Sequence, residues 1–254
     1  MQSDITAAFE AYVSASMRTL RDLGLTIRWG DDFDLFARII ERSGERYAPS
    51  PGFDPKARQG RDLDGLWLVA FDRGGKLVHT QAARCVDIRP DLVEHLRTCA
   101  DAYEPAYLPF DLDDMDVTLS PSASRLSGRT VYHGEAWLKP GPNGIRGGAY
   151  LYIFSRMMIA QALARWRTDH VMGLITHKMG SRGLASRYGY MRCEQGAVVF
   201  NPHSPKAQDL WLVWMTAEEA RCQMRLQPDY FVRTHMPVAE PMVEGTADRV
   251  AKVA

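Results

Sequence analysis

Residues 131–164 read VYHGEAWLKPGPNGIRGGAYLYIFSRMMIAQALA and contain the strongest indication of the fold. The first part of this segment belongs to Arg129–Leu138, which predicts a strand, and its last part belongs to the strongly apolar stretch Ala149–Trp166, which predicts a helix. A loop rich in glycine joins the two. The segment therefore predicts a strand that passes through a glycine loop into a long buried helix.

The glycine loop has the chemistry of an anion site. The first N–H groups of a helix have no partner within the helix, and the helix dipole favours negative charge at that end. Glycine lets a ligand approach the backbone closely, and Arg146 adds a charged donor. A plain connection between a strand and a helix is the alternative interpretation. The candidate residues for binding the phosphates of a cofactor are Leu138, Gly144, Arg146, Gly147, Gly148 and Ala149.

Together with the segments on either side of it, this stretch predicts an α/β protein with one mixed central sheet. Leu66–Phe71 and Lys76–Val86 flank the turn sequence DRGG and predict a β-hairpin. Because hairpins come first and later strands alternate with helices, we expect helices on both faces of the sheet. Other predicted strands are Leu25–Trp29, Val171–Thr176, Ala197–Phe200 and Leu210–Met215, and other predicted helices are Ile5–Leu23, Phe33–Ile40, Pro90–Tyr103, Ser181–Tyr188 and Ala217–Leu226.

The chain divides into three expected parts. Residues 1–24 form an N-terminal helical extension, residues 25–232 a single domain, and residues 233–254 a tail without periodicity that we expect to be loosely held. Tyr47–Gly65 and Glu104–Ser124 are rich in proline or glycine and predict irregular loops.

The order of these elements resembles the GNAT (GCN5-related N-acetyltransferase) superfamily. The resemblance runs from about Leu25 to Phe200 and is carried by three segments. Two of them are the hairpin LWLVAFDRGGKLVHTQAA (66–83) and the strand, glycine loop and helix quoted above. The third is HVMGLITHKMGSRGLASRYGYMR (170–192), with the Gly-aromatic pair Gly189-Tyr190. The resemblance implies an enzyme that uses acyl-CoA or acetyl-CoA as co-substrate and transfers the acyl group to an amine by direct attack, without a metal.

The glycine loop departs from the spacing Arg/Gln-x-x-Gly-x-Gly/Ala that is usual in the superfamily. Two alternatives therefore stay open. One is a long-chain acyltransferase that uses acyl carrier protein, of the autoinducer synthase or N-acyl amino acid synthase type. The other is a non-catalytic GNAT-like module that binds a metabolite or a protein.

The strand 131–138 supplies the candidate general base. Strict alternation places His133 and Glu135 on one face, so we expect their side chains to project together. Members of the superfamily often carry a carboxylate base on this strand, which makes Glu135 the first choice and His133 its companion. The alternative is that the two pair with each other, or with an arginine, for structural reasons.

A general acid is harder to assign. The tyrosine that many members place four residues before the glycine of the Gly-aromatic pair is replaced by Ala185. Tyr188 is the nearest hydroxyl and the candidate acid, with packing at the helix end as its alternative role. Arg182 and Arg187 lie near the same short helix, where they could meet a phosphate.

Composition excludes several classes of protein. Lys+Arg and Asp+Glu are both 31, so nucleic-acid binding through overall positive charge is not expected. The four cysteines form no Cys-x-x-Cys pair, which argues against a zinc site and a disulfide framework and fits the cytoplasm. No stretch is long and apolar enough for membrane insertion. The acidic cluster Asp111, Asp113, Asp114 and Asp116 is expected to be a solvated loop rather than a metal site, although it could face a cationic acceptor.

The expected partner is a small-molecule amine or an amino-acid-like acceptor, with acyl carrier protein as an alternative donor. A homodimer is left open.

Overall fold

The structure is a computed structural model, and it describes residues 2–57, 63–99, 114–141, 144–205 and 207–236. Within this part of the chain, one sheet contains the strands in the order β1-β2-β3-β5-β6-β8-β7-β4. Neighbouring strands are antiparallel except β5 and β6, which are parallel. The strands are β1 (Thr26–Gly30), β2 (Gly65–Phe71), β3 (Leu77–Ile88), β4 (Met115–Val117), β5 (Gly128–Leu138), β6 (His170–Thr176), β7 (Arg192–Phe200) and β8 (Gln208–Thr216).

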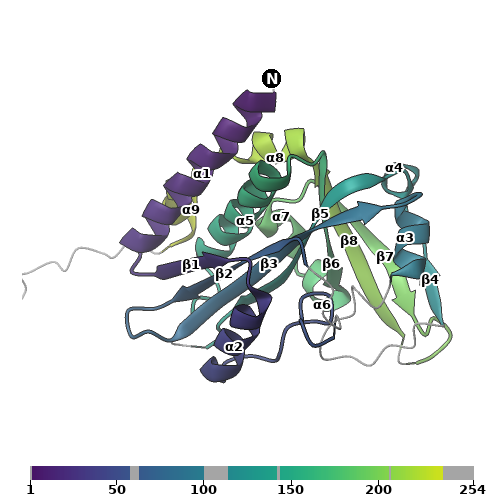
Figure 1. The fold of residues 1–254 in the computed structure, drawn as a ribbon, viewed down its shortest axis with the longest axis horizontal. Helices are drawn as coiled ribbons and strands as arrows, with labels where there is room; N and C mark the ends of the chain where they lie inside the picture. Colours follow the sequence, from purple (N-terminus) through teal and green to yellow (C-terminus); the bar gives the residue numbers. More distant parts are fainter. Residues whose placement is uncertain (1, 58–62, 100–113, 142–143, 206, 237–254) are drawn as a thin grey trace, which may run out of the picture.

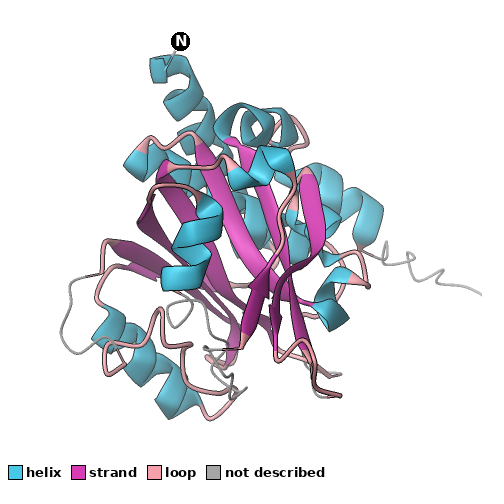
Figure 2. Ribbon diagram, turned by 90° about the vertical axis from the view of Figure 1, so that its right-hand side faces the viewer, coloured by secondary structure: helices cyan, strands magenta, loops and turns pink. Residues whose placement is uncertain are grey.

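Helices cover both faces of the sheet (Figures 1 and 2). Each face has its own hydrophobic core: one contains residues of α1, α5, α7, α8 and α9, and the other residues of α2, α3 and α4. The predicted mixed α/β sheet with helices on both faces is therefore confirmed. The helices are α1 (Gln2–Asp22), α2 (Phe33–Ser43), α3 (Leu92–Thr98), α4 (Pro121–Ser124), α5 (Tyr150–Trp166), α6 (His177–Gly180), α7 (Leu184–Tyr188), α8 (Ala217–Gln223) and α9 (Pro228–His235).

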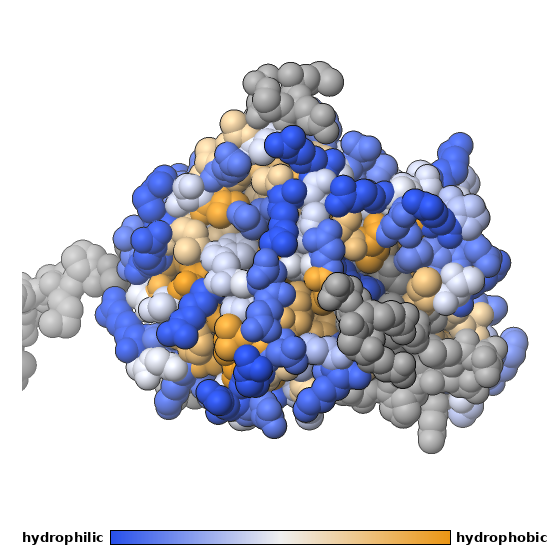
Figure 3. Space-filling model, viewed as in Figure 1, coloured by the Kyte–Doolittle hydropathy of each residue, from blue (hydrophilic) through white to orange (hydrophobic). Residues whose placement is uncertain are grey.

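Helix α5 is the centre of the larger core. Its sequence is apolar on nearly every side, which is typical of a helix that is covered all round. The sheet lies on one side of α5 and α1 on the other, where Phe9 and Tyr12 are buried. No helix in the described residues has the length and apolarity to cross a bilayer. The face shown in Figure 3 is mainly hydrophilic, with smaller hydrophobic areas between the charged side chains.

Several elements differ from the sequence prediction. The stretch Glu104–Ser124, expected to be an irregular loop, contains β4 and α4 in its described part. The helix expected over Ser181–Tyr188 forms only from Leu184, as α7, because Gly183 adopts a positive φ of 70°, and the short helix α6 lies before the expected range. The helix expected over Pro90–Tyr103 is described only as α3, which begins at the Asp91 N-cap and ends at Thr98. Helix α9 was not predicted: it begins at Pro228 and passes through the expected domain boundary at residue 232. Phe231 of α9 is buried in the main core, and residues 237–254 lie outside the described part.

The sheet divides between β5 and β6. The two strands pair only over Thr130–Tyr132 and His170–Met172. Gly173 follows directly, and a side chain there would lie 2.8 Å from the carbonyl oxygen of His133, so glycine permits the last close approach of the two strands. The cavity described below opens beyond this point.

Candidate active site

A cavity of about 1180 Å³ lies beyond the paired part of β5 and β6. Its walls come from segments that are distant in sequence: the stretch after α2, the second half of β5, the glycine loop, β6 with α6 and α7, and β8. Clefts at a point where a sheet divides are common ligand sites. The polar side chains on its walls are Glu45, Arg46, Tyr47, Ser50, Tyr132, His133, Glu135, Arg146, Thr176, His177, Lys178, Arg182, Arg187, Tyr188, Tyr190, Gln208 and Asp209.

A bulge in β5 separates Glu135 from His133. Thr80 of β3 faces Trp137 and Ala82 faces Gly134, so two residues of β5 stand opposite one residue of β3. Glu135 sits in the bulge with a positive φ of 56°. The prediction that His133 and Glu135 project together is therefore wrong, because the extra residue interrupts the alternation on which it was based.

The carboxylate of Glu135 is held by three donors. Arg46 lies 2.6 Å from one oxygen, and the backbone N–H of Ser50 donates to the other at 2.9 Å. The Ser50 hydroxyl donates to that second oxygen as well. The Glu135 side chain is only 5% exposed and that of Arg46 only 11%. Pairing with an arginine for structural reasons was one of the two interpretations of this residue, and the geometry favours it.

His133 belongs to a buried polar row beneath α5. Its Nδ1 lies 3.1 Å from the hydroxyl oxygen of Tyr190, and its Nε2 lies 3.4 Å from Oε1 of Gln81. Nε2 of Gln81 in turn donates to the carbonyl oxygen of Phe154 at 2.6 Å. Burial lowers the pKa of His133 to about 4, so its imidazole is neutral at neutral pH.

Tyr188 lines the same cavity. Its ring centre lies 6.0 Å from that of His133, and burial raises the pKa of its hydroxyl well above the ordinary value. Ala185, one turn earlier on α7, is buried in the main core. Helix α7 therefore offers Tyr188 to the cavity, and its role as an acid stays a prediction.

The glycine loop contributes fewer residues to the cavity than its sequence suggested. Leu138, Arg146 and Gly147 line it, and Nε of Arg146 donates to the Leu138 carbonyl oxygen at 3.0 Å. Gly144 instead packs against the chain itself, since a side chain there would lie 2.1 Å from the Lys139 carbonyl oxygen.

The last two candidates of the loop also lie off the cavity wall. A side chain at Gly148 would meet the carbonyl oxygen of His235 at 3.3 Å, because the end of α9 packs there. Ala149 is fully buried and serves as the N-cap of α5 without a capping side chain. Gly144, Gly148 and Ala149 therefore shape the loop, while the loop residues on the cavity wall are Leu138, Arg146 and Gly147; the cofactor-binding role of all six residues stays a prediction.

Cationic side chains gather on the walls contributed by α6, α7 and the glycine loop. Arg146, Lys178, Arg182 and Arg187 are exposed on these walls, and none has an ion pair with a described acidic residue. His177, in contrast, lies 3.0 Å from a carboxylate oxygen of Asp209. This side of the cavity has the charge that a phosphate-bearing ligand requires.

No metal centre is found in the described residues, where no group of three or more His, Cys, Asp or Glu side chains converges. Of the acidic cluster, Asp114 and Asp116 are described, and Asp116 pairs with Val199 at the sheet edge in β4. Asp111 and Asp113 lie outside the described residues.

Four residues of the site were not predicted from the sequence. Arg46 and Ser50 lie in or beside the proline-rich stretch that predicted only a loop, and Gln81 lies on a predicted core strand. Tyr190 was noted only as half of the Gly-aromatic pair. That pair was the one signal in the sequence that could have pointed to a member of the site.

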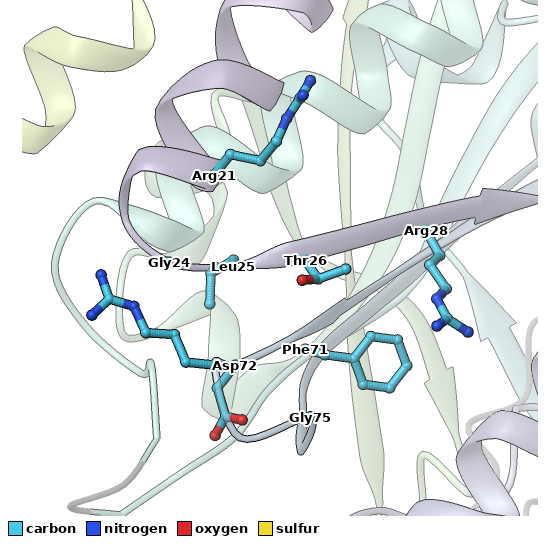
Figure 4. A pocket seen from close by; sticks show the side chains of 9 residues that line it. Arg21, Gly24, Leu25, Thr26, Arg28, Phe71, Asp72 and Gly75 are labelled. Carbon is cyan, nitrogen blue, oxygen red and sulfur yellow. The ribbon is translucent and has the colours of Figure 1, made fainter.

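A second hollow, of about 630 Å³, lies at the turn of the β2–β3 hairpin (Figure 4). Arg21, Arg28 and Arg73 contribute to its wall, and Arg28 stacks on Phe71 with 5.3 Å between the guanidinium carbon and the ring centre. The carboxylate of Asp72 accepts bonds from the backbone of the hairpin turn. The hollow has positive charge but no group placed for proton transfer, so we assign the candidate active site to the larger cavity.

No protein-family model matches the sequence, and no curated protein matches it. Solved structures of N-acetyltransferases do match. Arabidopsis thaliana NAA60 in complex with acetyl-CoA is 14% identical, with a TM-score of 0.40, over 76% of this chain and 98% of that chain. Spermidine N-acetyltransferase from Vibrio cholerae in complex with CoA and spermine is 10% identical, with a TM-score of 0.41, over 77% and 97%. An N-acetyltransferase from Staphylococcus aureus Mu50 is 10% identical, with a TM-score of 0.39, over 76% and 98%.

A strand and helix, a hairpin, a strand leading through a glycine loop into a long helix, and a further strand with a short helix follow one another as the GNAT resemblance implied. The order of elements that the resemblance implied is therefore observed in the structure.

Proposed function

We propose that this protein is an N-acyltransferase that transfers an acyl group from a CoA thioester to an amine. The observation that carries the proposal is the cavity between β5 and β6, which has cationic side chains on one wall and the His133–Tyr190 pair on another. The cationic side chains can bind the phosphates of a CoA thioester. The His133–Tyr190 pair can accept the proton that the amine loses when the acyl group is transferred to it.

The donor would occupy the wall formed by the glycine loop and α7. Arg146, Arg182 and Arg187 are suited to phosphate oxygens, and the uncapped N-terminus of α5 adds backbone N–H groups nearby. Beyond Tyr132 and Met172, the backbone N–H and C=O groups of β5 and β6 no longer pair with each other. An extended donor arm that carries amides could pair with them, because backbone N–H and C=O groups require partners.

The reaction would proceed by direct attack. The amine nitrogen attacks the thioester carbon, the carbon–sulfur bond breaks, and the products are an amide and free CoA thiol. The nucleophile must be a neutral amine, so a group of the cavity has to accept its proton. The chemistry requires no covalent intermediate and no metal.

Acyl carrier protein with a long acyl chain remains the second donor. Apolar side chains on the cavity wall favour it, since Leu151, Ile175 and Val213 offer a surface on which an alkyl chain can pack. Acetyl and long acyl chains therefore both belong in the test.

The first experiment measures donor binding. Calorimetric titrations with CoA, acetyl-CoA, myristoyl-CoA and myristoyl acyl carrier protein should show binding of at least one. Arg146→Ala should weaken CoA binding about tenfold, as expected for the loss of one charged hydrogen bond. Arg165→Ala, at an exposed position outside the cavity, is the matched control and should bind like the parent. Absence of binding to every donor would overturn the proposal.

The second experiment measures turnover. Release of CoA thiol is followed with the donor that binds best and a panel of polyamines, amino acids and aromatic amines. Thiol release that depends on the amine, together with the mass of the acylated product, supports the transferase. Donor binding without turnover on any amine favours the non-catalytic binding module instead.

A further inference from the structure

The amide of Gln81 has a defined orientation. Its Nε2 lies 2.6 Å from the carbonyl oxygen of Phe154, and a carbonyl oxygen can only accept a hydrogen bond. The Nε2 atom must therefore be the donor of this bond, which turns Oε1 toward His133.

This orientation determines the tautomer of His133. Oε1 of Gln81 is an acceptor and lies 3.4 Å from Nε2 of His133, so Nε2 carries the imidazole proton. Nδ1 then has a lone pair and accepts from the Tyr190 hydroxyl, 3.1 Å away. The row Phe154, Gln81, His133 and Tyr190 thus runs in one direction, with every proton pointing away from Tyr190.

The Tyr190 oxygen is left with its lone pairs available where the sheet divides. Its ring is buried and stacks near that of His133, with ring centres 6.3 Å apart. The oxygen lies 3.4 Å from the place where a side chain at Gly173 would begin, and Tyr190, His133 and Gly173 all line the cavity. A hydroxyl whose proton is already donated can accept a hydrogen bond from a ligand N–H.

We propose that Tyr190 is a catalytic residue whose hydroxyl oxygen receives the proton of the attacking amine while its own proton passes to Nδ1 of His133. The proposal rests on the proposed N-acyltransferase function. Gln81 is a positioning residue in this scheme, since it acts only by holding the tautomer of His133.

The proton balance closes over one turnover. As the nitrogen–carbon bond forms, the amine gives one proton to Tyr190, and Tyr190 gives one to His133. When the carbon–sulfur bond breaks, the leaving thiolate needs a proton, and the row returns one to it through the same hydroxyl. The enzyme ends in its starting state, and the products are the amide and the CoA thiol.

Other groups of the cavity are less suited to this step. Both oxygens of Glu135 already accept bonds from Arg46 and Ser50. Each ring nitrogen of His133 has a partner in the row, so the imidazole reaches a ligand only through Tyr190. Burial lowers the pKa of His133, so its protonated imidazole is unstable and returns the proton rapidly to Tyr190.

The kinetic test removes one hydroxyl. Tyr190→Phe keeps the ring, so the fold should persist, which a thermal melt and circular dichroism verify. With acetyl-CoA and the best amine of the panel, we expect kcat to fall about 100-fold or more while KM for acetyl-CoA stays within threefold. Tyr230→Phe, on the exposed part of α9, is the matched control and should keep parent kcat. Retention of more than half of the parent kcat by Tyr190→Phe would overturn the proposal.

A second measurement is independent of turnover. Nitrogen NMR of imidazole groups, with His133 identified by the loss of its signals in His133→Gln, should show the neutral form protonated at Nε2. Gln81→Leu should release this preference and lower kcat. A His133 protonated at Nδ1 would overturn the row. Absence of any turnover in the parent overturns the proposed function and this role together, whereas parent turnover with unchanged Tyr190→Phe overturns this role alone.

Discussion

Arg46 and Glu135, 89 positions apart in the sequence, form a buried ion pair at the bulge of β5, with 2.6 Å between the guanidinium nitrogen and the carboxylate oxygen. Arg46 also donates to the Glu135 carbonyl oxygen at 3.2 Å and to the Thr80 hydroxyl. One side chain therefore ties the stretch after α2 to the irregular part of two strands, and the pair belongs to the framework of the cavity wall.

Breaking this pair should destabilise the protein strongly. Glu135→Gln leaves the Arg46 guanidinium buried without a counter-charge, which costs about 3 kcal/mol in comparable sites. Urea denaturation measures the change in the free energy of unfolding. Asp31→Asn, which breaks the exposed pair with Arg165, is the control and should cost less than about 1 kcal/mol. A loss for Glu135→Gln as small as that of the control would contradict a structural role for the pair.

The loop before α5 should not tolerate a methyl group at Gly144. In Gly144→Ala the new carbon would lie 2.1 Å from the Lys139 carbonyl oxygen, and that oxygen also accepts the backbone N–H of Ile145. The loop must shift, so we expect a stability loss of about 1–3 kcal/mol and weaker CoA binding. Gly74→Ala, where the nearest atom is an Asp72 oxygen at 3.3 Å, should alter neither by more than a few tenths of a kcal/mol. Equal effects of both variants would remove the steric explanation.

We expect Arg156 to stabilise the turn at the end of α7 that carries Tyr188 and Tyr190. It is 3% exposed inside α5 and donates to the Arg187 carbonyl oxygen at 2.8 Å, and its guanidinium lies against the ring of Phe231. Gly189 is adjacent, and a side chain there would collide with Arg156. Arg156→Met fills similar volume but cannot donate, so we expect a loss of about 2 kcal/mol.

Hydrogen exchange gives the local test of this role. In Arg156→Met, amide exchange over residues 184–190 should accelerate more than exchange in β2 and β3, because the lost bonds end on the α7 turn. Uniform acceleration over the whole sheet would instead mean that Arg156 supports the fold in general.

Stability should fall as the solution becomes acidic. Burial lowers the pKa of His133 to about 4 and that of His79 to about 3, both below the unfolded value of about 6.5. Below pH 6.5 the unfolded chain therefore binds more protons than the folded chain, and the free energy of unfolding decreases. From pH 7 to pH 5 we expect a loss on the order of 2 kcal/mol for each of these histidines.

The measurement is a series of denaturant titrations between pH 7 and pH 5. His79→Phe should reduce the slope of stability against pH, because a neutral ring replaces one of the two groups and can keep the stacking on Phe154. His203→Gln, at an exposed position, is the control and should keep the slope of the parent. A parent stability that does not change over this range would contradict the prediction.

The sequence predicted elements whose signals are local. The β2–β3 hairpin follows from turn chemistry, since the Asp72 carboxylate accepts bonds within the turn and Gly75 adopts a positive φ. Helix α5 follows from a long run of apolar residues with high helix propensity. The loop between β5 and α5 was also located from its glycines, although only part of it reaches the cavity.

The arrangement of the candidate site could not be predicted, because it depends on partners that are distant in sequence. In β5 the side chains stop alternating between the two faces of the sheet at Glu135, because a bulge lies there and Glu135 pairs with Arg46. The role of Tyr190 depends on His133, and that of His133 on Gln81, which lies two strands away in the chain order. Helix α9 was missed although Pro228 at its start and Asp229 in its first turn are local helix signals, and Phe231 packs it on the core.

The division between β5 and β6 also bears on how the protein avoids unwanted association. A sheet that opens in its middle has two additional strand edges, and exposed edges tend to recruit strands of other chains. Here both inner edges face the same cavity, whose walls include the bulky side chains of α6, α7 and the stretch after α2. A small extended molecule can enter this space, but a second protein strand with its own side chains meets those walls. The opening can therefore admit a ligand while the backbone it exposes stays protected from aggregation.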